Sequence, residues 1–212
     1  MPVTAKICGL STPETLDAAI GGGASHAGFV FFPPSPRNVA FEMAAGLAGR
    51  VPGHVGKVGV FVDPDDALIE TAIGAARLDA VQLHKVTPER SAAIRARFGR
   101  ETWAAVAIKT RADLETARNY RSAVDKILYD AKTPDDASRP GGMGLRFDWS
   151  LLDEFDHPLP WALSGGLTPD NVAEAIRRTG ARLVDVSSGV ESAPGVKNVD
   201  KIAAFLKAVR AC

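Results

Sequence analysis

Residues 57–84 read KVGVFVDPDDALIETAIGAARLDAVQLH and contain one complete strand–helix–strand pattern. A β-branched and apolar run over 57–61 predicts a strand, and a second short apolar run over 80–83 predicts another. Between them, apolar side chains recur over 65–76 at the spacing of one helix face. Two strands joined by a helix are typical of a parallel pair with a crossover connection, so this stretch predicts a parallel sheet covered by helices.

The same alternation runs through the rest of the chain. The predicted strands are residues 4–8, 27–31, 57–61, 80–83, 102–108, 126–129, 161–163 and 183–186. The predicted helices are residues 12–20, 65–76, 88–98, 112–120, 169–179 and 200–209. Helix starts are indicated by a capping box from Ser11 to Glu14 and by Pro64, Pro88 and Pro169 in first turns.

Eight strands in strict alternation with helices predict one α/β domain over residues 1–212. The simplest such fold is a single (β/α)8 or TIM barrel, with eight parallel strands ringed by helices. An open doubly wound sheet shows the same alternation and is the structural alternative. Its usual G-x-G-x-x-G turn is absent after the first predicted strand, where Cys8-Gly9-Leu10-Ser11 stands. We therefore expect the closed barrel.

The charge of the chain is balanced, with 25 Lys and Arg against 25 Asp and Glu in 212 residues. No net field draws such a chain to nucleic acid or to an anionic membrane, so we expect a small molecule as its partner. No segment approaches the roughly 18 apolar residues of a spanning helix, and the N-terminus lacks a signal-peptide core. With Cys8 and Cys212 as the only cysteines, a cytoplasmic location is expected. A monomer and a homodimer are both compatible with the sequence.

Alternation along the strands predicts which side chains face the barrel interior. If the apolar set faces the helices, then Lys6, Cys8, His84 and Asp130 face inward. The last three stand at the carboxyl ends of their strands, where barrel active sites lie. Cys8 and Asp130 are therefore predicted as an acid–base pair, with Lys6 favouring the thiolate. Taken singly, Cys8 also fits a small buried core residue and Asp130 a cap of the next turn.

Two glycine-containing turns follow the last two predicted strands. They are Ser164-Gly165-Gly166 and Ser187-Ser188-Gly189. Glycine lets backbone N–H groups approach phosphate oxygens, and barrels commonly hold a phosphate at this position. The two turns together predict a phosphate site, with ordinary tight turns as the alternative.

Two further loops carry predictions. Arg37 follows a stiff Pro-Ser-Pro turn and is predicted to bind a substrate carboxylate through two N–H groups, an exposed surface arginine being the alternative. The connection over 131–144 is long and rich in glycine, which predicts either a lid beside Asp130 or a disordered loop. No metal site is predicted, because the four histidines lack ligand spacing: His26, His54, His84 and His157.

Several short segments occur in a specific order along the chain. They are KICG (6–9), GFVF (28–31), SPR (35–37), VGVFV (58–62), VQLH (81–84), Asp130, GGMG (141–144), FDW (147–149), SGGL (164–167), PDNV (169–172), DVSSGVE (185–191) and PGVK (194–197). Over nearly its whole length the chain thereby resembles the phosphoribosylanthranilate isomerase family of tryptophan biosynthesis.

The resemblance implies a cofactor-free Amadori rearrangement of a phosphosugar, from N-(5'-phosphoribosyl)anthranilate to 1-(2-carboxyphenylamino)-1-deoxyribulose 5-phosphate. It implies that Asp130 is the general acid that opens the furanose ring and that Cys8 is the general base at C2′. It places Arg37 near the anthranilate carboxylate. We expect Asp185 to orient the substrate amine, the alternative being that it accepts hydrogen bonds from backbone groups at the strand end. The predicted substrate-binding residues are Arg37, His84, Gly165, Gly166, Asp185, Ser187, Ser188 and Gly189.

This chemistry needs a deprotonated thiol and a protonated carboxyl at one pH, which reverses the ordinary order of their pKa values. We expect Lys6 to lower the pKa of Cys8. We expect the apolar wall around Leu128, together with the loop over 131–144, to raise the pKa of Asp130 by desolvation.

Three residues depart from the family pattern. Lys85 stands where glycine is common, Met143 where threonine is usual and Asn198 where aspartate is usual. Two other functions are alternatives to the isomerase of tryptophan biosynthesis. The isomerase of histidine synthesis and broad-specificity relatives carry an aspartate base on strand one and a half-barrel repeat, whereas Cys8 stands here. A barrel that binds phosphate without catalysis is disfavoured by the presence of both Cys8 and Asp130.

Overall fold

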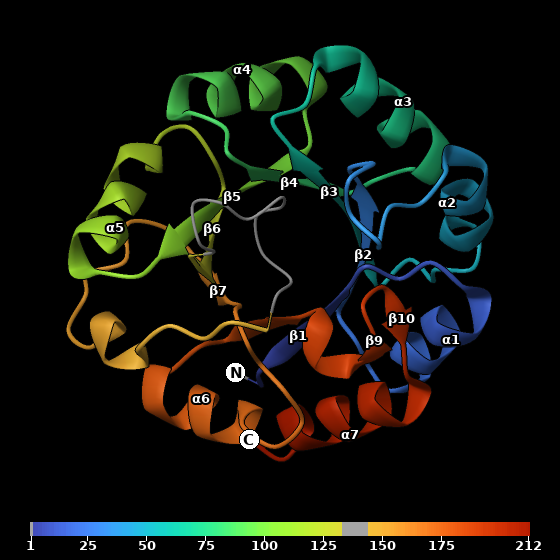
Figure 1. The fold of residues 1–212 in the computed structure, drawn as a ribbon. Helices are drawn as coiled ribbons and strands as arrows, with labels where there is room; N and C mark the ends of the chain where they lie inside the picture. The colour runs from blue at the N-terminus through green and yellow to red at the C-terminus, as the bar shows by residue number, and fades with distance from the viewer. Residues whose placement is uncertain (1, 133–143) are drawn as a thin grey trace.

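Strands β1 to β8 form a closed parallel barrel in the computed structural model, which describes residues 2–132 and 144–212 (Figure 1). Each strand pairs with its neighbours in chain order, and β1 pairs with β8 to close the ring. The strands are β1 Thr4–Cys8, β2 His26–Phe31, β3 Gly56–Val62, β4 Ala80–His84, β5 Glu101–Ile108, β6 Lys126–Ala131, β7 Trp161–Leu163 and β8 Leu183–Val186. The barrel prediction is confirmed, and the open doubly wound sheet is excluded.

Helices surround the barrel on its outer side (Figure 1). They are α1 Pro13–Gly21, α2 Phe41–Ala48, α3 Asp66–Ala76, α4 Pro88–Phe98, α5 Arg111–Glu115, α6 Val172–Thr179 and α7 Val199–Arg210. Three 3-10 helices accompany them: η1 Thr116–Tyr120, η2 Trp149–Leu152 and η3 Ser188–Val190. A two-stranded hairpin of β9 Glu191–Ala193 and β10 Val196–Lys197 follows β8 and η3.

Some helix boundaries differ from the sequence prediction. The capping box from Ser11 is wrong, because Thr12 is the N-cap of α1 and its hydroxyl accepts from Thr15 N at 3.3 Å. Pro64 precedes the N-cap Asp65, whose side chain accepts from Leu68 N, whereas Pro88 does open α4.

Further along the chain, the helix predicted over 169–179 begins later, at Val172. Thr168 and Asn171 close a turn just before it, in which Thr168 N donates to the Asn171 side chain at 2.8 Å. The single helix predicted over 112–120 divides into α5 and η1.

The packing of the strands follows the predicted alternation. Ile7, Val81, Leu83, Ile127 and Tyr129 belong to the large apolar core between strands and helices. Inside the barrel, a separate cluster fills the part nearer the amino ends of the strands: Val58, Ala80, Trp103, Leu128, Ala162 and Leu183. Cys8, Val30 and Val60 form a third cluster nearer the carboxyl ends of the strands. This interior filling makes the barrel a packed core that carries its site at one end.

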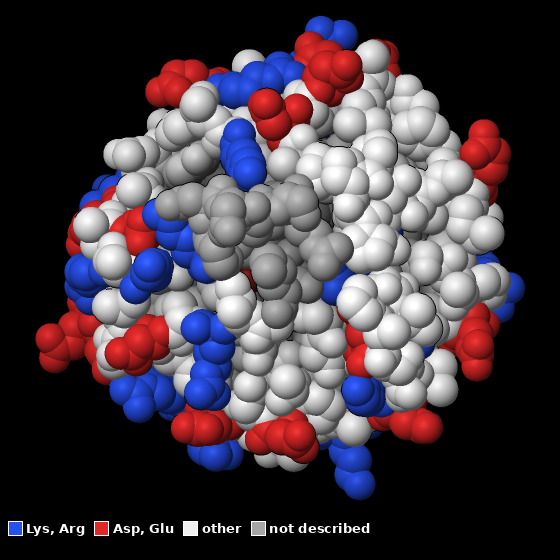
Figure 2. Space-filling model, viewed as in Figure 1, with Lys and Arg blue, Asp and Glu red and all other residues white. Residues whose placement is uncertain are grey.

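Charged side chains of both signs are interspersed around the rim of the face seen in Figure 2. No helix among the described residues is long and apolar enough to cross a membrane. The predicted lid falls mostly on residues 133–143, which lie outside the described residues, as does Met143.

Candidate active site

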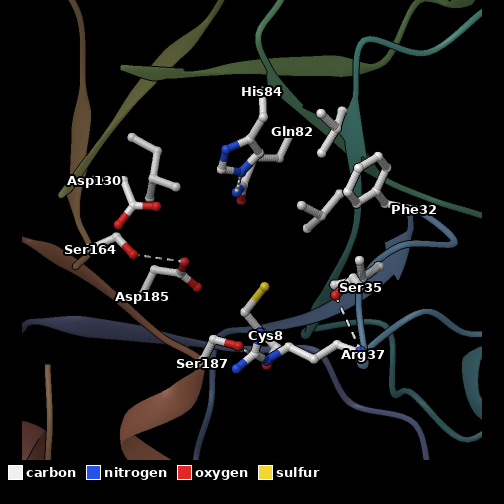
Figure 3. A pocket seen from close by; sticks show the side chains of 14 residues that line it. Cys8, Phe32, Ser35, Arg37, Gln82, His84, Asp130, Ser164, Asp185 and Ser187 are labelled. Carbon is white, nitrogen blue, oxygen red and sulfur yellow. Dashed lines mark hydrogen bonds between the residues drawn. The ribbon is translucent and has the colours of Figure 1, made fainter. Parts of the chain in front are cut away.

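One cavity opens at the carboxyl ends of the strands and has a volume of about 560 Å³, including the space at its mouth (Figure 3). Six of the predicted site residues line it: Cys8, Arg37, His84, Asp130, Asp185 and Ser187. They come from five strands or the loops after them, and they are separated by up to 179 positions in the chain. The lining also includes Gln82 and Ser164, which were not among the predicted site residues. Both are polar and buried, Gln82 within β4 and Ser164 directly after β7. The signal that could have identified them is a polar side chain at an inward-facing strand position and in the turn after a strand.

Cys8 ends β1 with its side chain 6% exposed, and its sulfur points into the cavity (Figure 3). Gly28 on β2 makes room for it, because a Cβ there would lie 3.2 Å from the Cys8 Sγ and 3.0 Å from its Cα. Burial raises the pKa of Cys8, and the nearby Lys6 charge opposes this without reversing it. Lys6 thus lowers the pKa of Cys8 as expected, but burial has the larger effect, and the pKa of the thiol is raised overall.

Asp130 lies near the end of β6 and enters the cavity from another side (Figure 3). Its Oδ1 accepts a hydrogen bond from the backbone N–H of Ala131 at 2.9 Å. Burial, followed by repulsion from Asp185, raises the pKa of Asp130 to about 7. The expected desolvation effect is thus present in the described residues, and it leaves a carboxyl that can hold a proton near neutral pH.

Lys6 and Asp185 form a buried ion pair at the cavity wall, with Lys6 Nζ 2.8 Å from Asp185 Oδ1. The hydroxyl of Ser164 donates to the other oxygen, Asp185 Oδ2, at 3.3 Å. Asp185 also raises the pKa of Cys8, so it adds to the effect of burial and opposes that of Lys6.

His84 ends β4 and lies 2.9 Å from the Gln82 amide nitrogen through its Nε2 atom. Burial lowers the pKa of His84 to about 4, with Lys6 adding to this effect. His84 is therefore neutral at neutral pH, and it presents a hydrogen-bonding ring to the cavity and not a charge.

Arg37 lies in the loop after β2 and is 5% exposed. Its Nε and Nη2 atoms donate to the two carboxylate oxygens of Glu191, both at 2.7 Å. The arginine is thus buried at the cavity wall in a bidentate ion pair, which the sequence did not predict. Glu191 and its second partner Lys197 lie in the segments DVSSGVE and PGVK that carry the family resemblance, but neither was predicted to be a site residue.

The predicted phosphate turns lie at the ends of β7 and β8. Gly165 and Gly166 adopt positive φ angles of 86° and 64°, which favour glycine. A Cβ on Gly189 would lie 1.8 Å from the backbone oxygen of Leu167, so the β8 turn packs directly against the segment after β7. Ser187 lines the cavity, while Ser188 and Gly189 form the adjacent η3.

Among residues 2–132 and 144–212, no group of three or more His, Cys, Asp or Glu side chains is arranged to hold a metal ion. In the same part of the chain, the polar groups of the lining are a thiol, two carboxylates, an imidazole, an amide, an arginine and hydroxyl groups, and the rest of the lining is apolar. These groups are suited to acid–base chemistry on a small anionic molecule.

Comparison with known proteins supports the same chemistry. A family model described as N-(5'phosphoribosyl)anthranilate (PRA) isomerase matches residues 5–208. A protein of Zymomonas mobilis subsp. pomaceae named N-(5'-phosphoribosyl)anthranilate isomerase is 57% identical over 212 residues, covering 99% of each chain. A protein of the same name from Paramagnetospirillum magneticum is 53% identical over 211 residues, covering 99% of this chain and 98% of the relative.

Solved structures agree with the sequence relatives. The phosphoribosyl anthranilate isomerase of Thermotoga maritima is 37% identical, with a TM-score of 0.88 over 99% of this chain and all of that chain (100%). A structure of the isomerase in complex with reduced 1-(o-carboxyphenylamino)-1-deoxyribulose 5-phosphate is 35% identical, with a TM-score of 0.86 over 99% and 100% of the two chains. This chain therefore belongs to the N-(5'-phosphoribosyl)anthranilate isomerase family and is an isomerase of tryptophan biosynthesis.

Proposed function

We propose that Asp130 and Cys8 are the general acid and the general base of an Amadori rearrangement in this cavity. The reaction converts N-(5'-phosphoribosyl)anthranilate to 1-(2-carboxyphenylamino)-1-deoxyribulose 5-phosphate. The observation that carries the proposal is the placement of a thiol and a carboxyl, from β1 and β6, on one cavity, with the pKa of the carboxyl raised to about 7. Such a carboxyl is still partly protonated near neutral pH, and the raised pKa of Cys8 makes its thiolate a minor form at that pH but a stronger base.

In the first step, protonated Asp130 donates its proton to the furanose ring oxygen. The bond between C1′ and that oxygen breaks, and the lone pair of the anthranilate nitrogen forms a C1′=N double bond. The product of this step is an open-chain, protonated Schiff base, and Asp130 is left as a carboxylate. The backbone N–H of Ala131, which donates to Asp130 Oδ1, stabilises that charge.

In the second step, the Cys8 thiolate removes the proton from C2′. The electron pair of the broken C–H bond forms a C1′=C2′ double bond and neutralises the nitrogen, which gives an enolamine. C1′ then gains a proton and the C2′ hydroxyl loses one, which gives the ketone. The Cys8 thiol and the Asp130 carboxylate left by the two steps are the donor and the acceptor of these protons, so both groups return to their starting forms. The substrate and the product are isomers, so the rearrangement needs no external electron acceptor.

The remaining predicted residues bind the substrate. Arg37 binds the anthranilate carboxylate, and Asp185 orients the bridging amine. The turns containing Gly165 and Gly166 and containing Ser187, Ser188 and Gly189 hold the 5′-phosphate through backbone N–H groups. Neutral His84 contributes a hydrogen bond to the same molecule.

The proposal treats residues 1–212 as one domain that works in the cytoplasm without a cofactor. It holds for a monomer and for a homodimer, because every residue it uses comes from one chain. Balanced charge offers no basis for a nucleic-acid partner.

The test is a fluorescence assay on freshly generated N-(5'-phosphoribosyl)anthranilate. We expect Cys8→Ala and Asp130→Asn each to lower kcat by about 10²–10⁴-fold while retaining affinity for the product. Cys212→Ala is the matched control, because it removes an exposed thiol that does not line the cavity. A folded but inactive wild-type protein would overturn the proposal, and so would a Cys8→Ala or Asp130→Asn variant that keeps full activity.

A further inference from the structure

The hairpin of β9 and β10 contains two charged residues that the proposed mechanism does not use. Glu191 opens the hairpin and Lys197 closes it, and their side chains are 4% and 1% exposed. A buried ion pair generally adds little stability over apolar side chains of the same volume. We therefore ask which groups the Glu191–Lys197 pair holds in position.

Glu191 holds the guanidinium of Arg37 through both of its oxygens. Arg37 Nε lies 2.7 Å from Oε1, and Nη2 lies 2.7 Å from Oε2. Burial on its own raises the pKa of Glu191, but the bonds from Arg37 and the charge of Lys197 outweigh it and lower the pKa overall. The carboxylate is therefore ionised at neutral pH, and a planar two-point contact fixes the orientation of the arginine.

Lys197 connects the same carboxylate to the end of β8. Its Nζ atom donates to Glu191 Oε1 at 2.6 Å and to the backbone oxygen of Ser187 at 3.0 Å. Ser187 in turn donates its hydroxyl to the backbone oxygen of Cys8 at 3.2 Å. A continuous set of contacts thus joins Arg37, through the hairpin, to the backbone that carries the thiol.

The backbone on both sides of Arg37 also packs closely, in the hairpin turn and after β1. Gly195 in the hairpin turn has a φ of 83°, and a Cβ there would lie 2.4 Å from the backbone oxygen of Pro36. Its N–H donates to Glu191 Oε2 at 3.2 Å. On the other side, a Cβ on Gly9 would lie 2.8 Å from Cδ of Arg37. The arginine is therefore held between the residue after Cys8 and the hairpin.

We propose that the β9–β10 hairpin, through Glu191 and Lys197, is a positioning clamp that sets the Arg37 guanidinium relative to Cys8 for the carboxylate of the substrate. The clamp reaches over the end of β1 from β8 to the loop after β2 (Figure 1). Glu191 and Lys197 are positioning residues, because they act through Arg37 and Ser187. The inference rests on the proposed role of Arg37 as the group that binds the anthranilate carboxylate.

The variant Glu191→Gln tests the clamp. Its amide oxygen can accept one bond from Arg37, but its NH₂ group would face donors of Arg37 and Gly195. Arg37 must then leave its orientation, and small misplacements of a substrate-orienting group cost about ten- to a hundredfold. We expect KM for N-(5'-phosphoribosyl)anthranilate to rise by at least about tenfold, with kcat within about threefold of wild type.

A second substrate distinguishes positioning from general damage. N-(5'-phosphoribosyl)aniline has the same sugar phosphate and amine but no carboxylate. We expect Glu191→Gln to leave the KM for this analogue within about twofold of wild type. Loss of folded protein would instead lower kcat for both compounds and leave both KM values unchanged. Ser192→Ala is the matched control, because it alters an exposed hairpin side chain that bonds only within the hairpin.

Arg37→Ala and the double variant Arg37→Ala/Glu191→Gln complete the experiment. If the clamp acts through Arg37, Glu191→Gln adds nothing to the KM once Arg37 is gone. Lys197→Met, like Glu191→Gln, is expected to raise the KM for the carboxylate substrate. Equal losses on both substrates, or full additivity in the double variant, would overturn the clamp while leaving the role of Arg37 intact. An Arg37→Ala variant with unchanged KM would overturn the proposed carboxylate site itself, and the clamp with it.

Discussion

The Nζ atom of Lys6 donates to Oδ1 of Asp185 at 2.8 Å, and this pair joins a fully buried lysine to a carboxylate that lines the cavity. Lys6 lowers and Asp185 raises the pKa of both Cys8 and Asp130. The pair therefore exerts opposing effects on the two groups to which we assign the proton transfers. Its integrity bears on both the stability of the barrel and the pH range of activity.

Replacing one member of this pair is expected to destabilise the fold strongly. Lys6→Met leaves Asp185 as a buried carboxylate without its cation, a change that typically costs about 3–5 kcal/mol. The double variant Lys6→Met/Asp185→Asn removes both charges and should recover most of that loss. Urea denaturation of the three proteins at one pH measures both effects. A single variant as stable as wild type would contradict the expected dependence on pairing.

The two single variants should move the pH profile of kcat/KM in opposite directions. Activity needs deprotonated Cys8 and protonated Asp130, so the acidic limb falls at the lower pKa of the pair, about 7 for Asp130. Asp185→Asn removes a negative charge, lowers both pKa values and shifts both limbs to lower pH. Lys6→Met raises both pKa values and shifts both limbs to higher pH. Limbs that stay in place in both variants would show that the pair does not tune the reacting groups.

Asp130 is expected to lower stability at the pH where it serves catalysis. The folded protein holds its proton up to about pH 7, whereas the unfolded chain releases it near 3.9. The folded state therefore binds more protons between these values, and the free energy of unfolding falls as the pH rises.

Asp130→Asn should accordingly be more stable than wild type at about pH 8, by up to about 4 kcal/mol, and should match it near pH 4. Denaturant unfolding at both pH values checks this. A variant whose advantage is the same at both pH values would argue against a raised pKa.

The sequence was sufficient for the barrel because its strands are marked by short β-branched runs. Alternation then placed Cys8 and Asp130 on the interior, since their strand neighbours Ile7 and Tyr129 belong to the core between strands and helices. Helix α2 was missed for an equally local reason. Its eight residues, FEMAAGLA, follow an N-cap, Ala40, that makes no side-chain hydrogen bond. The start of such a helix is fixed by packing and not by a local capping pattern.

The pairing of charges could not be predicted from the sequence. Lys6 was correctly placed beside Cys8, but its partner Asp185 is 179 positions away, and only barrel closure brings them together. The same holds for Arg37 and Glu191, which are 154 positions apart. Local patterns indicate which face a side chain occupies, whereas ion-pair partners depend on the three-dimensional arrangement of loops from different strands.

Lys85 provides a test of a departure from the family pattern. The resemblance leads us to expect glycine at this position, and Lys85 adopts a φ of 55°, a left-handed conformation that costs energy in a residue with a Cβ. Lys85→Gly should relieve this strain and raise Tm by about 2–4 °C. Lys109 follows β5 as Lys85 follows β4 and is not among the described residues with positive φ, so Lys109→Gly should not raise Tm. Calorimetry distinguishes the two, and equal shifts would mean that backbone strain is not the cause.

Asn198 departs from the expected aspartate without structural cost, since its side chain caps α7 by accepting from Lys201 N at 2.9 Å, as an aspartate can.

Gly189 is a position where even one added methyl group cannot fit. A Cβ there would lie 1.8 Å from the Leu167 backbone oxygen, so the turn after β8 would have to move away from the segment after β7.

Because we assign both turns to the phosphate, Gly189→Ala should raise KM for the substrate and weaken competitive inhibition by inorganic phosphate. It should also destabilise the fold by about 1–3 kcal/mol. Gly46→Ala makes the same chemical change within α2, where nothing lies within 4 Å, and should leave both binding constants unchanged while slightly stabilising the helix. Steady-state kinetics with phosphate as the inhibitor separates binding from stability. If Gly189→Ala is destabilised but binds substrate and phosphate normally, the two turns serve packing and the phosphate lies elsewhere in the cavity.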